Sequence, residues 1–150
     1  MTLILGTVFL TAGAQKVEIV KYDQVETLMK KSGSNLKIFN FWATWCGPCI
    51  KELPYFESAN QKENVEVYLV SLDFPEDAEK VKRFVAKKNL KSTTFLLDEK
   101  NYDSYMGRVS NDWSGAIPAT LFVDGNGKRY FYETPFNESE LEKKISEYLN

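Results

Sequence analysis

Residues 41–49 read FWATWCGPC, and this stretch decides the fold. It begins inside a nearly continuous run of apolar and β-prone residues, Leu36–Trp42, which predicts a strand buried on both faces. A helix is expected to begin near Cys46 and to end near Lys62. Cys46 and Cys49 therefore form a C-x-x-C pair at a junction between a strand and a helix.

The cysteine pair in this position is suited to reversible disulfide chemistry. Unpaired N–H groups and the helix macrodipole favour an anion at a helix N-terminus. Cysteines in such positions have pKa values of roughly 3.5–7.5, against about 8.5 for a free cysteine. We therefore predict that Cys46 attacks as a thiolate and that Cys49, one turn further along, resolves the mixed disulfide.

Other roles for the two cysteines find less support. A structural disulfide that closes so short a loop stabilises a protein by only about 2 kcal/mol in the chain-entropy model. A zinc site needs four ligands, and a chain with 2 cysteines and no histidine offers only carboxylates for the remainder. Two alternatives stay open. One is a peroxidase, although no P-x-x-x-T-x-x-C pattern occurs, and the other is a Cu(I)-binding module. We predict neither a metal nor a cofactor for the main function.

The composition narrows the range of functions further. A chain of 150 residues is enough for one domain, and the lack of histidine excludes Ser-His-Asp and Cys-His catalysis. The 19 basic and 21 acidic residues are scattered and give a net charge of −2. Because no basic stripe is present, we expect no nucleic-acid partner. We expect a monomer.

The N-terminus favours export. Residues 1–15 are interpreted as a signal-peptide remnant, and residues 16–150 as the folded domain. An apolar run over residues 3–10 is followed by the small residues Ala12-Gly13-Ala14, as at a secretory cleavage site, and the run is too short to span a bilayer. No basic residue precedes the run, so a first strand, or a start inside a longer leader, is the alternative. We expect an exported, periplasmic protein.

The remaining periodicities indicate an α/β fold. Strands alternating with helices require parallel crossovers, and DGNG at residues 124–127 predicts a hairpin near the C-terminus. A mixed central sheet with helices on both faces is therefore expected. Its further elements are a strand near 17–22, a helix from the capping box Asp23–Glu26 to Gly33, a strand at 65–72, a helix from Pro75, a short strand at 95–97, a loop or broken helix at 101–111, strands at 120–123 and 129–132, and a helix capped by Asn137 that places Leu141, Ile145, Tyr148 and Leu149 on one face.

Two separated motifs resemble the thioredoxin superfamily. The sequence WCGPC at 45–49 resembles its active site, Pro54 resembles the proline that kinks its active-site helix, and IPATL at 117–121 resembles its cis-proline loop. The resemblance covers residues 17–150 and implies a thioredoxin-like fold, with a cis Ile117–Pro118 bond packed against the two cysteines. The substrate-binding residues that it implies are Trp45, Gly47, Pro48, Ile117 and Pro118.

Asn40 and Glu52 mark a departure from cytosolic thioredoxins. Asn40 stands where those proteins carry a buried aspartate, and an asparagine cannot take a proton from the resolving thiol. Glu52 lies three residues after Cys49 and resembles the active-site glutamate of the exported TlpA/ResA-like branch. We predict that Glu52 handles this proton, the alternative being an ordinary solvated helix residue.

The resemblance also implies partners and a direction of electron flow. The expected substrates are protein disulfides, and a membrane or periplasmic reductase would restore the dithiol. Gly47-Pro48 between the cysteines resembles members that act as reductases. Among the aromatic residues, Trp113 is predicted to pack in the protein interior, the alternative being a role in substrate binding. Four tyrosines are expected to face the core and the sheet: Tyr102, Tyr105, Tyr130 and Tyr132.

Overall fold

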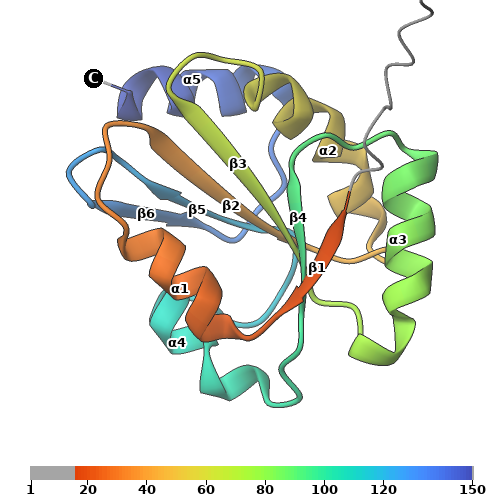
Figure 1. Ribbon diagram of the computed structural model, residues 1–150. Helices are drawn as coiled ribbons and strands as arrows, with labels where there is room; N and C mark the ends of the chain where they lie inside the picture. The colour runs from red at the N-terminus through yellow and green to blue at the C-terminus, as the bar shows by residue number, and fades with distance from the viewer. Residues whose placement is uncertain (1–15, 150) are drawn as a thin grey trace, which may run out of the picture.

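The computed structural model describes residues 16–149, which form a six-stranded mixed sheet in the order β1-β4-β3-β2-β5-β6 (Figure 1). β1, β4, β3 and β2 run parallel to one another, whereas β5 runs antiparallel to both β2 and β6. The strands are β1 Val17–Val20, β2 Leu36–Trp42, β3 Val65–Ser71, β4 Thr93–Leu97, β5 Ala119–Val123 and β6 Arg129–Tyr132. The predicted mixed sheet is confirmed; the signal-peptide interpretation of residues 1–15 lies outside the described residues.

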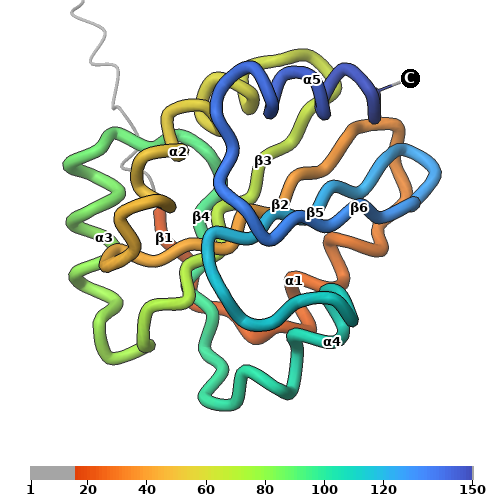
Figure 2. The backbone as a smooth tube through the Cα atoms, turned by 180° about the vertical axis from the view of Figure 1, so that it is seen from behind, coloured from red at the N-terminus to blue at the C-terminus, as the bar shows by residue number. Residues whose placement is uncertain are grey.

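Helices cover both faces of this sheet, as predicted (Figures 1 and 2). One face packs against α2 (Gly47–Ala59), α3 (Ala78–Lys87) and α5 (Glu138–Tyr148). The other packs against α1 (Tyr22–Lys30) and the short α4 (Met106–Val109). Two 3₁₀ turns, η1 (Pro75–Asp77) and η2 (Tyr102–Ser104), precede α3 and α4. Within residues 16–149, none of the helices combines the length and the apolar character needed to cross a membrane.

β2 lies inside the sheet between β3 and β5, and all of its residues are buried. Its apolar side chains serve both layers of the core, which explains why the run Leu36–Trp42 is nearly continuous instead of alternating. The chain leaves the carboxyl end of β2 and enters α2 within a few residues. Cys49, Leu53 and Phe56 of α2 are buried, and Pro54 lies inside the helix as expected.

The ends of three helices differ from the predicted positions. α1 begins at Tyr22, one residue before the expected capping box, and the backbone N–H of Lys21 donates to Oε1 of Gln24 at 3.0 Å. The earlier start buries Tyr22 on the same face as Val25 and Met29. α1 also ends at Lys30, before Gly33.

Side chains distant in sequence explain two of these ends. Lys37 of β2 donates its ammonium to the carbonyl oxygen of Leu28 at 3.0 Å and so satisfies the C-terminal turn of α1. α2 ends at Ala59 instead of Lys62: the backbone N–H of Lys62 donates to the carbonyl oxygen of Ala59, as in a turn, and Oδ1 of Asn60 accepts the backbone N–H of Val67 at 2.9 Å. In α5 the expected apolar face is buried except Leu149, which follows the last helical residue and is exposed.

Candidate active site

Cys46 and Cys49 meet at the carboxyl end of β2 and are joined in a disulfide. Cys46 is the N-cap residue of α2, with an extended backbone, and its Sγ accepts the backbone N–H of Cys49 at 3.3 Å. Cys46 is 6% exposed, whereas Cys49 is fully buried. An incoming disulfide therefore meets Cys46 first, and the amide groups of the helix start favour negative charge on its sulfur.

A buried carboxylate holds the loop that leads into Cys46. Asp73, just beyond the end of β3, accepts the backbone N–H of Thr44 at 2.9 Å and the hydroxyl of Ser71 at 2.7 Å. The hydroxyl of Thr44 donates to the same carboxylate. These bonds tie the carboxyl ends of β2 and β3 together and leave Trp45, at the tip of the loop, 62% exposed.

The Ile117–Pro118 bond is cis, as the sequence resemblance implies. It packs against the redox pair, with the carbonyl oxygen of Ile117 3.8 Å from Sγ of Cys46. Pro118 is buried and Ile117 is half-buried. Within residues 16–149, Ile117 makes no hydrogen bond to another backbone group, since the pairing of β5 with β2 begins only at Ala119.

Two side chains fix the loop before the cis bond. Glu133 accepts the backbone N–H groups of Ser114 at 3.1 Å and of Ala116 at 3.0 Å, and the Ser114 hydroxyl also donates to it. The hydrogen bonds from Ser114, with that from Ala116, lower the pKa of the Glu133 carboxyl from its ordinary value. On the other side, Nε1 of the buried Trp113 donates to the carbonyl oxygen of Ala116 at 2.9 Å.

Trp113 therefore packs in the core, as expected, and positions the cis-proline loop. It does not line the groove on the substrate side of this loop. Its ring contacts the rings of Phe41, Tyr105 and Phe131, with centroids 4.8, 6.1 and 5.8 Å away. The cis-proline loop is thus anchored to the core on the face covered by α1 and α4.

Glu52 is a buried residue, so its interpretation as a solvated helix residue is wrong. It is 1% exposed, and its carboxylate accepts Nδ2 of Asn40 at 2.9 Å and the backbone N–H of Phe136 at 2.7 Å. Burial raises the pKa of the Glu52 carboxyl to about 7, although the two hydrogen bonds act in the opposite direction. Glu52 can therefore gain or lose a proton near neutral pH.

Asn40 occupies a fully buried position on β2 beside this carboxylate. Its Nδ2 also contacts Oγ1 of Thr120 on β5 at 3.2 Å, while its Oδ1 has no hydrogen-bond partner within residues 16–149. Cys49 and Glu52 are neighbours at i and i+3 on α2, and both are buried. The carboxylate is thus fixed by β2 and by the segment before α5, one helical turn from the inner sulfur.

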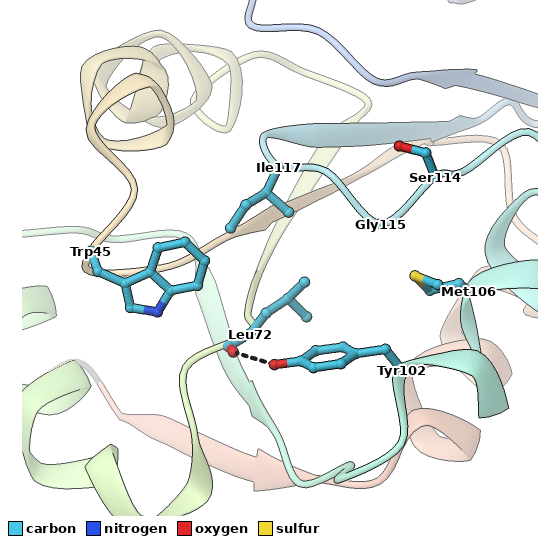
Figure 3. A pocket seen from close by; sticks show the side chains of 7 residues that line it. All are labelled: Trp45, Leu72, Tyr102, Met106, Ser114, Gly115 and Ile117. Carbon is cyan, nitrogen blue, oxygen red and sulfur yellow. Dashed lines mark hydrogen bonds between the residues drawn. The ribbon is translucent and has the colours of Figure 1, made fainter.

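Two surface grooves include five of the eight predicted site residues in their linings. A groove of about 550 Å³ opens beside Glu52 and includes Gly47, Pro48 and Lys51 among its lining residues. A second groove of about 380 Å³ is lined by Trp45, Leu72, Tyr102, Met106, Ser114, Gly115 and Ile117 (Figure 3).

Of the four tyrosines expected in the core or on the sheet, Tyr102 is 37% exposed in this groove, so its prediction is wrong. Tyr105 is buried as predicted, and Tyr130 and Tyr132 pack partly against the core.

The disulfide, the cis-proline loop and strands β1 to β5 lie in a segment that matches a known family. A sequence profile of the AhpC/TSA family matches residues 12–129, which is most of the chain. The chain belongs to the AhpC/TSA family.

Curated relatives of this AhpC/TSA chain carry names of thiol–disulfide enzymes. It is 38% identical over 95 residues to the thiol-disulfide oxidoreductase ResA of Oceanobacillus iheyensis, and this match covers 61% of this chain and 45% of that protein. It is 28% identical over 116 residues to the thiol:disulfide interchange protein HelX of Rhodobacter capsulatus, covering 76% and 61% respectively. The chain thus spans about half the length of the curated relatives it matches.

Solved structures confirm the thioredoxin-like fold of this AhpC/TSA chain. A thioredoxin-related protein from Neisseria meningitidis matches with a TM-score of 0.65 and 25% identity, over 76% of this chain and 84% of that one. A thioredoxin-family thiol:disulfide interchange protein from Chlorobium tepidum matches with a TM-score of 0.66 and 18% identity, over 78% and 81%. At the latter identity the match concerns the fold alone.

Three residues around the site were not predicted from the sequence, namely Asp73, Glu133 and Tyr102. The position of Asp73 in the sequence gave a weak indication of its role. It follows the buried strand β3, whose carboxyl end lies at the same end of the sheet as the loop that carries Cys46. Glu133 and Tyr102 act across separations of 15 residues or more, to Ala116, Ser114 and Leu72, and no local pattern indicates such contacts.

Proposed function

We propose that this AhpC/TSA chain is an enzyme that exchanges disulfides with protein substrates outside the cytoplasm, and that it works as a reductase. The observation that carries the proposal is the Cys46–Cys49 disulfide at the start of α2, with Cys46 Sγ beside the cis-proline loop. The names of the curated relatives support this chemistry, and the apolar N-terminal sequence supports export.

The reaction needs only the two cysteines and a proton acceptor. The Cys46 thiolate attacks a substrate disulfide and forms a mixed disulfide, and one substrate sulfur leaves as a thiolate. The Cys49 thiolate then attacks Cys46 Sγ, which releases the second substrate sulfur and forms the Cys46–Cys49 disulfide. Two electrons pass from the protein to the substrate, and a partner reductase must return them.

The residues around Cys46 and Cys49 suit both steps of this reaction. The backbone N–H of Cys49 points at Cys46 Sγ and, with the helix start, stabilises a thiolate there. In the part of the chain that the structure describes, the backbone of Ile117 pairs with no other backbone group; it lies beside the reactive sulfur, where we propose that it pairs with an extended substrate segment. The substrate-binding residues that we propose are Trp45, Gly47, Pro48, Ile117 and Pro118.

Glu52 is proposed to take the proton of Cys49. Both side chains are buried on α2, where water has little access to the inner thiol. A carboxylate with a pKa of about 7 is a base matched to neutral pH. Its negative charge also disfavours a second negative charge on sulfur, so Cys49 keeps its proton until the mixed disulfide has removed the charge on Cys46.

Reduction of a protein disulfide by the variants Cys46→Ser and Cys49→Ser tests the proposal. Cys46→Ser should abolish insulin reduction, whereas Cys49→Ser should accumulate a mixed disulfide that a gel without reductant detects. Ile19→Ser, an exposed change on the edge strand β1, is the control for general damage. Turnover by Cys46→Ser near that of the wild type would overturn the proposal.

Two further measurements address the direction and the alternatives. Equilibration with glutathione gives the reduction potential of the Cys46–Cys49 couple, and a value well below that of the glutathione pool supports a reductase. Consumption of hydrogen peroxide that depends on Cys46 would instead favour the peroxidase. Stoichiometric Cu(I) binding by the reduced protein, without insulin reduction, would favour the metal-binding alternative.

A further inference from the structure

The loop that places Ile117 beside Cys46 is not held by backbone pairing. Between residue 16 and residue 149, the backbone groups of residues 114–117 make no hydrogen bond to another backbone group, and the pairing of β5 with β2 begins only at Ala119. Residues 114–116 are also exposed, so burial contributes little to their order. The conformation of this loop therefore depends on side chains that bind its backbone from outside.

Glu133 provides most of these contacts. Its Oε1 accepts the backbone N–H of Ala116 at 3.0 Å and the hydroxyl of Ser114, and its Oε2 accepts the backbone N–H of Ser114 at 3.1 Å. Hydrogen bonds to an ionised carboxylate are roughly twice as strong as those between neutral groups. One carboxylate thus holds the loop on both sides of Gly115, which has φ +97°.

The position of Glu133 is itself fixed. It directly follows β6, whose last residue, Tyr132, is paired with β5. Three residues further along, the backbone N–H of the buried Phe136 donates to the carboxylate of Glu52 at 2.7 Å. Pro135 lies between these two points and restricts the backbone there. The anchor of the loop is therefore tied to the sheet on one side and to the core on the other.

This anchoring determines the direction of the backbone groups of Ile117. The N–H of Ala116 is held by Glu133, and its carbonyl oxygen accepts Nε1 of Trp113 at 2.9 Å. The carbonyl of Ala116 and the N–H of Ile117 belong to one planar peptide group, so fixing the first also fixes the second. The carbonyl of Ile117 belongs to the cis bond to Pro118. Both backbone groups of Ile117 are thus oriented before a substrate arrives.

We infer that Glu133 is a positioning residue for the disulfide exchange, because it holds the cis-proline loop in the conformation in which Ile117 pairs with the substrate backbone. This inference rests on the proposed function and adds to it a residue that acts through the loop. Without the carboxylate, the substrate itself has to order the loop, which weakens binding. Glu133 should therefore matter for disulfides that bring a peptide backbone and much less for small disulfides.

The test compares two symmetric disulfides as oxidants of the reduced protein. One is the disulfide-linked dimer of a short peptide that contains only Gly, Ala and Ser around a single cysteine. The other is 2-hydroxyethyl disulfide, which has no peptide group. Acid quenching and labelling of the remaining protein thiols give a second-order rate constant for each. We expect Glu133→Ala to lower the ratio of the peptide rate constant to the small-disulfide rate constant by about tenfold.

Further variants grade this effect. Glu133→Gln keeps one oxygen that accepts hydrogen bonds but has no charge, so its ratio should lie between those of the wild type and Glu133→Ala. Ser114→Ala removes only the hydroxyl bond and should lower the ratio less. It also keeps the test available if Glu133→Ala does not fold. Glu63→Ala, the same change at an exposed position before β3, is the matched control and should keep the wild-type ratio.

Methylation of the substrate backbone tests the pairing itself. A second peptide dimer carries N-methyl groups on the residues that flank its cysteine, which removes N–H donors and leaves the side chains unchanged. The wild type should oxidise more slowly with this dimer than with the unmethylated one. Glu133→Ala should discriminate between the two peptides less than the wild type does, because its loop is no longer set for pairing.

The outcomes separate this inference from the function on which it rests. If Glu133→Ala keeps the wild-type ratio, or lowers both rate constants in parallel, Glu133 does not position the loop for substrate and the inference is wrong, while the proposed function stands. If the wild type reduces neither the peptide dimer nor 2-hydroxyethyl disulfide, the proposed function itself is contradicted.

Discussion

Replacing Glu52 by Gln should change how the stability of the oxidised protein depends on pH. In the oxidised protein neither cysteine titrates, so the carboxyl group acts alone. The pKa of Glu52 is raised from 4.5 to about 7 in the native state, chiefly because burial disfavours its charged form. Gln fills the same space and keeps an oxygen for the N–H groups of Asn40 or Phe136, but it has no proton to lose.

The sign of the effect follows from which state binds the proton. Below pH 4.5 the carboxyl is protonated in both the folded and the unfolded chain, and its contribution to stability is fully present. Between pH 4.5 and about 7 the unfolded chain releases the proton first, so the free energy of unfolding falls as the pH rises. Above about pH 7 both states are ionised and the loss is complete.

The magnitude follows from the size of the shift. Each pKa unit corresponds to about 1.4 kcal/mol, so the shift from 4.5 to about 7 amounts to about 3 kcal/mol. The wild type should lose this amount between acid and neutral pH, and Glu52→Gln should not. The two proteins should be similarly stable at pH ~4, and the variant should be more stable by about 3 kcal/mol at pH ~8.

Urea denaturation of both oxidised proteins across this pH range measures the difference directly. Other titrating groups are common to the two proteins and cancel in the comparison. Glu63→Gln, a change at an exposed position in the turn before β3, is the matched control and should run parallel to the wild type. A wild-type-minus-variant difference that stays constant within about 0.5 kcal/mol from acid to neutral pH would refute a burial-raised pKa at Glu52.

Three further results are expected. In the reduced protein, Glu52→Gln should lower the apparent pKa values of the thiols, because a nearby negative charge is removed; titration of the thiolate ultraviolet absorbance checks this, and superimposable curves would contradict the proton-handling role. Asp73→Ala should destabilise the protein by about 1–3 kcal/mol, since it leaves the N–H of Thr44 and the hydroxyl of Ser71 without their acceptor; denaturation measures the loss, and insulin reduction should fall with it. Gly115→Ala should cost about 1–2 kcal/mol through its positive φ, with the closeness of Met106 adding to the strain; unchanged thermal stability would show that the loop relaxes freely.

The fold was predictable where residues close in sequence already indicate the position of an element in the folded chain. The apolar run of β2 is buried on both faces because the strand lies inside the sheet, so its composition already reflects its neighbours. The C-x-x-C pair then fixes the chemistry at the junction with α2, and DGNG gives the hairpin between β5 and β6. Each of these features depends on residues that are close in sequence.

The helix ends and the supports of the site depend instead on distant residues. α1 ends where Lys37, from the next strand, reaches its carbonyl groups, and the cis-proline loop is held by Glu133 from beyond the following hairpin. Tyr102 was expected in the core because tyrosine usually packs. Asn101 instead caps η2, where its side chain accepts the N–H of Asp103, and the hydroxyl of Tyr102 donates to the carbonyl oxygen of Leu72. Such contacts have no periodicity and appear only in the folded chain.

The two grooves share no lining residue, and this separation matters for the chemistry of the pair. A substrate segment that reacts with Cys46 as proposed lies beside the apolar groove at Trp45 and removes water there, which strengthens the charges that remain. If the same groove also contained Glu52, bound substrate would bury the carboxylate further, raise its pKa above the neutral range and prevent it from accepting the proton of Cys49. Glu52 is instead a buried residue in the lining of the groove beside Gly47 and Pro48, so a substrate on the side of Trp45 leaves its surroundings unchanged. The proposed substrate recognition and the proposed proton transfer therefore use separate groups around one disulfide, and neither changes the conditions that the other needs.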